Sequence, residues 1–163
     1  MVKDYAYALK GDEHYAEKAA RISAMARDLC ELLPQMLPEL ADKLQGRVQK
    51  IKGKMAYHPP CTLQHAQRLK GVVERDLAKL GFQMLVSRTE SHLCCGSAGT
   101  YSILQPELSK KLRARKLAAL DEACGEEKPA LILSSNVGCI THLQSGTDVP
   151  VKHWVEVLDE ALV

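Results

Sequence analysis

The chain has 163 residues, of which 46% are apolar and 26% charged, and its 22 Lys and Arg residues against 20 Asp and Glu residues give a formal net charge of +2. This length suffices for one domain with its own core, so no disulfide or metal is needed merely to hold the fold together. The ordinary apolar fraction and the small net charge argue against disorder and against a nucleic-acid partner. Because no run of about 20 apolar residues is present and charges begin at Lys3, the sequence predicts neither a transmembrane segment nor a secretion signal.

The first part of the chain has a helical pattern. Apolar residues recur at intervals of three and four between Asp12 and about Leu44, and Pro34 and Pro38 interrupt them. Since proline breaks the interior of a helix, two helices are expected, roughly 12–32 and 38–45. The sequence therefore predicts a helical segment at 1–46, followed by a second domain at 47–163.

Strands and helices alternate in this second part. The predicted strands are 54–58, 82–86, 130–134 and 149–153. One helix is expected after each of them: from Thr62 to a stop at Gly81, through Leu104 to Leu120, from about Val137, and from Trp154 onward. This alternation predicts an α/β fold with a mainly parallel sheet, flanking helices and an N-terminal helical extension.

Four of the six cysteines follow successive strands. Cys61 comes after the first strand, Cys94 and Cys95 after the second, and Cys139 after the third. In a parallel sheet these positions share one edge, which is where open α/β sheets build their sites. Without an export signal the thiols should be reduced, and thiolates favour an iron-sulfur cluster or zinc. Gly96 and Gly99 let the backbone approach such a centre and point amides at its sulfur atoms.

The remaining cysteines and the histidines leave alternatives open. Cys30 and Cys124 lie in or at the end of predicted helices and are equally well explained as small buried apolar side chains. His142 follows Cys139 by three residues, so it is a ligand, a neighbour of the centre or an unrelated residue on a helix face. His58 either orients its loop through a hydrogen bond or donates one to a ligand.

Longer motifs surround these cysteines. They read Pro60-Cys-Thr-Leu-Gln-His65, His92-Leu-Cys-Cys-Gly-Ser-Ala-Gly-Thr-Tyr-Ser102, Asn136-Val-Gly-Cys-Ile-Thr-His142 and Val151-Lys-His-Trp154. Over essentially the whole chain, this pattern resembles the cysteine-rich CCG domain family, and within it the iron-sulfur subunits of glycolate (2-hydroxy acid) dehydrogenases. The family pattern is one Cys, then Cys-Cys-Gly, then Cys-x-x-Cys, whose last position falls on His142 here.

The resemblance implies a site and a function. Cys61, Cys94, Cys95 and Cys139 would hold a [4Fe-4S] cluster, with His142 as a neighbour or additional ligand; this suits the residues better than a cluster held by five cysteines. The chain would relay electrons from a flavin subunit towards quinone without catalysing bond chemistry itself. Its partners would be flavin-containing subunits and an N-terminal ferredoxin-like portion with a first CCG domain. The ferredoxin-like portion and the first CCG domain are absent from this sequence. The protein would be cytoplasmic or peripheral on the inner membrane.

Two other functions fit the same cysteines. One is a zinc-binding module for structure or assembly. The other is a thiol-dependent disulfide reductase of the heterodisulfide reductase type, which would use a Cys-His pair. A flavin or nicotinamide site is not indicated, because Gly96-Ser-Ala-Gly99 is not the dinucleotide-binding G-x-G-x-x-G pattern.

Overall fold

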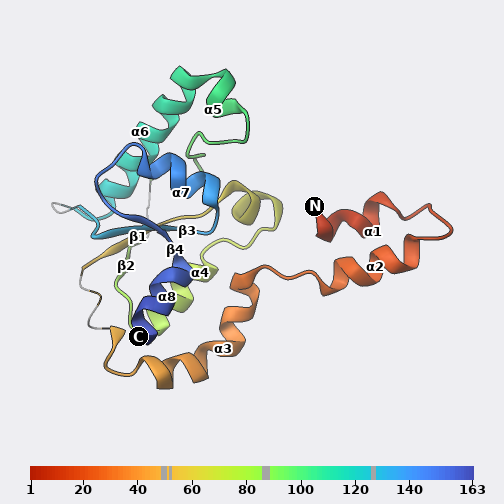
Figure 1. Ribbon diagram of the computed structural model, residues 1–163, viewed down its shortest axis with the longest axis horizontal. Coiled ribbons are helices and arrows are strands. Elements are labelled where there is room, and N and C mark those ends of the chain that lie inside the picture. The colour runs from red at the N-terminus through yellow and green to blue at the C-terminus, as the bar shows by residue number, and fades with distance from the viewer. Residues whose placement is uncertain (49–50, 52, 86–88, 126–127) are drawn as a thin grey trace. The chain divides into compact units, whose positions relative to one another are not determined.

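The protein forms two compact units, Met1–Gln35 and Met36–Val163. A computed structural model describes residues 1–48, 51, 53–85, 89–125 and 128–163 (Figure 1). Among these residues, no helix has both the length and the apolar character needed to cross a membrane.

Four parallel strands form the sheet of the second unit, in the order β2-β1-β3-β4 (Figure 1). They are β1 (Met55–His58), β2 (Met84–Leu85), β3 (Leu131–Ser134) and β4 (Val151–His153). Every residue of β1 is buried, as expected for a parallel sheet that helices cover on both faces. The predicted α/β fold is confirmed. The second strand is shorter than the predicted 82–86, and residue 86 lies outside the described residues.

Helices flank both faces of this sheet. α6 (Pro106–Glu122) and α7 (Val137–Gln144) lie on one face, and α4 (Val72–Lys79) and α8 (Trp154–Leu162) on the other (Figure 1). Side chains from three strands, α6, α7 and one loop share an apolar cluster: Ala56, Cys95, Leu117, Leu120, Ile132, Cys139, Leu143 and Val151. Two of the four site cysteines are therefore part of the hydrophobic core.

The helices predicted after the first two strands are each divided in two. The first becomes a π-helical turn at Thr62–Ala66 and then α4, because Arg68 and Gly71 between them take left-handed φ values of 59° and 74°. The second becomes α5 (Tyr101–Leu104) and α6, since Gln105 leaves the helical conformation ahead of Pro106. Proline at the first position of a helix costs no hydrogen bond, which explains why α6 begins there.

The predicted helices at 12–32 and 38–45 are wrong in their boundaries. After η1 (Val2–Asp4) and α1 (Tyr5–Ala8), the structure has α2 (Ala16–Met25) and α3 (Leu29–Leu44). α3 continues through Pro34 and Pro38. Both prolines are exposed, whereas Leu33, Leu40 and Leu44 are buried. Burial of this apolar stripe outweighs the two missing backbone donors.

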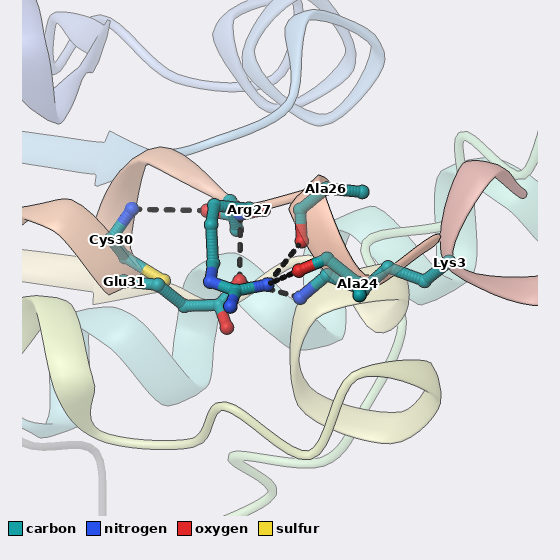
Figure 2. Close-up of polar contacts among 7 residues, drawn as sticks. Lys3, Ala24, Ala26, Arg27, Cys30 and Glu31 are labelled. Atoms are coloured by element: carbon teal, nitrogen blue, oxygen red, sulfur yellow. Dashed lines mark hydrogen bonds and ion pairs between the residues drawn. The ribbon is translucent and has the colours of Figure 1, made fainter. Parts of the chain in front are cut away.

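The break between α2 and α3 comes from a capping box that the sequence analysis missed. Asp28 accepts a hydrogen bond from the backbone N–H of Cys30 at 3.1 Å, and the Glu31 carboxylate accepts one from the N–H of Asp28 at 2.7 Å. Lys3 Nζ lies 2.5 Å from the same carboxylate, and the Arg27 guanidinium donates to two carbonyls at the end of α2 (Figure 2). The Asp-x-x-Glu pattern is the sequence signal that starts α3.

Candidate metal centre

The four cysteines that follow the strands lie at the carboxyl edge of the sheet, but among the described residues only Cys95 and Cys139 belong to a compact group of possible metal ligands. Cys95 and Cys139 are buried, whereas Cys61 and Cys94 are partly exposed. Burial and the neighbouring thiols of Cys94 and Cys95 raise the pKa of Cys61. A hydrogen bond from the Cys139 thiol is the main cause that lowers the pKa of Cys95, and the same bond raises the pKa of Cys139. The arrangement thus favours a thiolate at Cys95.

His58 is the third donor beside this buried pair. One ligand atom each from His58, Cys95 and Cys139 lie within 4.8 Å of one another, and all three residues are buried. The imidazole is 0% exposed, and neither ring nitrogen has a hydrogen bond of regular geometry to any described residue. Its contact with the Cys95 sulfur is close enough that a hydrogen bond from His58 adds to the lowering of the pKa of Cys95. An imidazole and two thiols form a donor set that suits zinc or iron.

Two polar residues hold this group in place. Ser97 Oγ lies 3.4 Å from Cys95 Sγ and 4.0 Å from Cys139 Sγ. Asn136 caps α7, where its side-chain oxygen accepts a hydrogen bond from the N–H of Cys139 at 3.2 Å. The cap fixes the start of α7 and therefore the position of the Cys139 thiol.

The two glycines that follow the cysteine pair differ in their surroundings. Gly96 donates its N–H to Cys94 Sγ at 3.3 Å, as expected for an amide directed at a sulfur ligand. Its φ is +94°, and a Cβ there would lie 2.4 Å from the backbone oxygen of Ser109 in α6. Gly99 also has a positive φ, +59°, but a Cβ there would meet no atom within 4 Å. Only Gly96 is required by close packing.

His142 lies outside the compact group of His58, Cys95 and Cys139. Its Nε2 is 3.1 Å from Ser109 Oγ and 3.5 Å from the Ser109 carbonyl, while that hydroxyl donates to the carbonyl of Gly96 at 2.8 Å. Because the hydroxyl proton is used on Gly96, the network assigns the His142 proton to Nε2. His142 therefore braces the cysteine loop through Ser109, and only its Nδ1 keeps a lone pair.

Lys116 is a buried cation beside this site that the sequence analysis did not identify. Its side chain is 1% exposed, and Nζ donates to the carbonyls of Glu90 and Ser91 at 2.7 and 3.4 Å. Within the described residues it has no carboxylate partner, since the Glu90 carboxylate pairs with Arg115. Burial lowers the pKa of Lys116, and negative charge on Cys61 is the largest opposing effect. A signal was present, because Lys116 falls on the same buried stripe of α6 as Leu120.

Fold and site together define a class: an α/β domain with a parallel sheet whose carboxyl edge gathers four cysteines. Residues 55–144 match the family model described as a CCG cysteine-rich domain, and the chain belongs to this family. The resemblance inferred from the motifs is confirmed.

Particular relatives extend the similarity over nearly the whole chain. It is 47% identical over 162 residues to the glycolate oxidase iron-sulfur subunit of Escherichia coli (strain K12), which covers 99% of this chain and 37% of that protein. It is 25% identical to lactate utilization protein A of Oceanobacillus iheyensis and 27% identical to that of Geobacillus thermodenitrificans, over 98% of this chain and 64% and 65% of theirs. The chain thus spans less than two thirds of the length of each of these relatives.

Proposed function

We propose that this chain is the iron-sulfur module of a glycolate or related 2-hydroxy acid dehydrogenase and that it transfers electrons. The observation that carries the proposal is the buried pair Cys95 and Cys139, within 4.8 Å of a His58 nitrogen, with Cys61 and Cys94 at the same sheet edge. Cys94 and Cys95 lie near enough to Cys61 to raise its pKa. Four thiolates match the ligand set of a [4Fe-4S] cluster. When bound, such a cluster accepts and releases single electrons.

The surrounding residues fit an anionic sulfur centre. The buried ammonium of Lys116 supplies positive charge beside the thiols, and the Gly96 amide donates to Cys94 Sγ. Hydrogen bonds and charges near the sulfur atoms are what set the potential of such a centre. The proposed electron donor is a flavin-containing subunit and the proposed acceptor a quinone, which would place the complex in the cytoplasm against the inner membrane.

A structural zinc site is the second candidate, and one observation favours it. Ligand atoms on a single tetrahedral zinc lie roughly 3.5–3.8 Å apart, given Zn–N and Zn–S bonds of about 2.0 and 2.3 Å. The 4.8 Å group of His58, Cys95 and Cys139 is close to that spacing. A disulfide reductase is less well supported, because Cys95, the thiol whose pKa is lowered, is 1% exposed and shielded from a disulfide substrate.

Metal and sulfide analysis decides between these functions. The protein is purified without oxygen and reconstituted with ferrous iron and sulfide, and its iron, zinc and sulfide contents are counted. Visible and EPR spectra are recorded before and after reduction. The proposal expects iron and sulfide in equal amounts and an EPR signal on reduction. Zinc without sulfide supports the structural module, and alkylation-sensitive turnover of a disulfide without bound metal supports the reductase.

A further inference from the structure

The imidazole of His58 is buried in a way that its protein surroundings do not explain. It lies at the carboxyl end of β1, where the Ser134 hydroxyl donates to its backbone carbonyl at 2.9 Å. The backbone of His58 is thus fixed in the sheet. No hydrogen bond of regular geometry reaches either ring nitrogen within the described chain, and the only partner beside the ring is the Cys95 sulfur, whose pKa His58 helps to lower. Burying a polar group without a partner destabilises the folded state. Such a group in a core indicates a missing partner.

The surroundings of the ring indicate what that partner is. A nitrogen of His58 and the sulfur atoms of Cys95 and Cys139 form a triangle with no edge longer than 4.8 Å. A neutral imidazole offers one lone pair, which is the form that binds metals. We propose that His58 is a metal ligand, bound through an imidazole nitrogen at the same centre as Cys95 and Cys139. This inference rests on the metal centre of the proposed function. Four thiolates already give one ligand to each iron of a [4Fe-4S] cluster, so a His58 ligand would take the place of one thiolate or add a fifth donor to the centre.

The other candidate histidine, His142, lies outside this triangle. His142 directs Nε2 at Ser109 and is not among the ligand atoms that converge on the buried thiols. A role for His58 as a hydrogen-bond donor only would satisfy one nitrogen with a weak sulfur acceptor and leave its lone pair unused. Coordination uses the lone pair and leaves the opposite N–H for a hydrogen bond. His58 is therefore the nitrogen ligand that the geometry favours.

Nitrogen hyperfine spectroscopy tests this assignment. The reconstituted, reduced protein is prepared with natural histidine and with 15N-histidine, and electron-nuclear double resonance is recorded for both. A ligand gives a strong nitrogen coupling that changes with the isotope. This coupling should disappear in His58→Gln and persist in His142→Gln, the matched control. Circular dichroism verifies that each variant is folded, and the labelled wild-type spectrum needs no variant at all.

Each result has a defined meaning. A cluster without strong histidine coupling overturns the ligand assignment and leaves the proposed function intact. A cluster whose coupling survives in His58→Gln and vanishes in His142→Gln assigns the ligand to His142 and also overturns it. If no cluster forms, the proposed function fails, and X-ray absorption of the zinc-loaded protein decides the inference. Imidazole scattering that is lost in His58→Gln supports His58, whereas its absence from the wild type, or a lack of zinc binding, overturns the assignment.

Discussion

The substitution Gly96→Ala should damage both the stability of the domain and the cysteine loop. The added Cβ would lie 2.4 Å from the Ser109 carbonyl oxygen and 3.1 Å from Leu112 Cβ. The first neighbour is backbone within α6 and cannot rotate away. The φ of +94° adds conformational strain of about 1–3 kcal/mol, and overpacking adds about the same again. A lower entropy of the unfolded chain offsets about 0.4–1 kcal/mol of this.

The expected loss for Gly96→Ala is therefore about 2–5 kcal/mol, a large part of the 5–15 kcal/mol typical of a domain. Gly99→Ala is the matched control, because it has a positive φ of +59° and open space around its Cβ. It should cost only about 0–1.5 kcal/mol. Urea unfolding followed by circular dichroism gives both values. Equal losses for the two variants would show that the contact with α6 does not constrain the loop, and the argument from packing would be refuted.

Three further predictions concern the site and the dependence on pH. Cys95→Ser should lose most of the bound iron and sulfide on reconstitution. Cys30→Ser should bind as much as the wild type, because Cys30 belongs to the N-terminal unit Met1–Gln35 and burial raises the pKa of its thiol to about 12. Lys116→Met should destabilise the domain by roughly 1–3 kcal/mol in urea unfolding, since two carbonyls lose their donor, and should shift the midpoint potential of the loaded protein downward. Hydrogen bonds from Arg75 lower the pKa of Asp76. The charged carboxylate therefore stabilises the fold fully above the ordinary carboxyl pKa, and this stabilisation disappears as the pH falls through the lowered pKa. The free energy of unfolding of Asp76→Asn should accordingly decrease less than that of the wild type below about pH 4.

Each of these predictions has an outcome that contradicts it. Full iron loading of Cys95→Ser would remove that residue from the ligand set. An unchanged potential in Lys116→Met would mean that its charge does not reach the centre. A pH profile of unfolding in Asp76→Asn that matches the wild type would show that the pair with Arg75 is no stronger in the folded state than in the unfolded state.

The sheet and the positions of the cysteines could be predicted from the sequence, but the burial of the side chains around the site could not. Short apolar runs between helical patterns located the strands, and a parallel sheet then places Cys61 and Cys139 at the same edge. Burial depends on neighbours from distant segments, so no local pattern distinguished His58, which is in the core, from His142, which faces Ser109. The burial of Lys116 was not predicted, because a lysine in an amphipathic helix is normally exposed even when it falls on the apolar stripe.

The predicted helix boundaries were wrong where two local sequence signals favoured different boundaries. The prolines of α3 predicted an interruption, but both lie on the exposed side, and the burial of Leu33, Leu40 and Leu44 keeps the helix continuous. The helix is interrupted between α2 and α3, where Asp28 and Glu31 form the capping box. This capping signal outweighs the apolar periodicity, which continues through the same residues.

The inclusion of Cys95 and Cys139 in the hydrophobic core has a consequence for the order of assembly. Thiols pack as small apolar groups, so Cys95 and Cys139 pack in the core with Ala56 and Ile132 before any metal binds. The chain is therefore expected to fold first and to be loaded afterwards, unlike zinc fingers, in which binding and folding are one event. An incoming metal would therefore meet the partly exposed thiols of Cys61 and Cys94 before it reaches the buried thiols of Cys95 and Cys139.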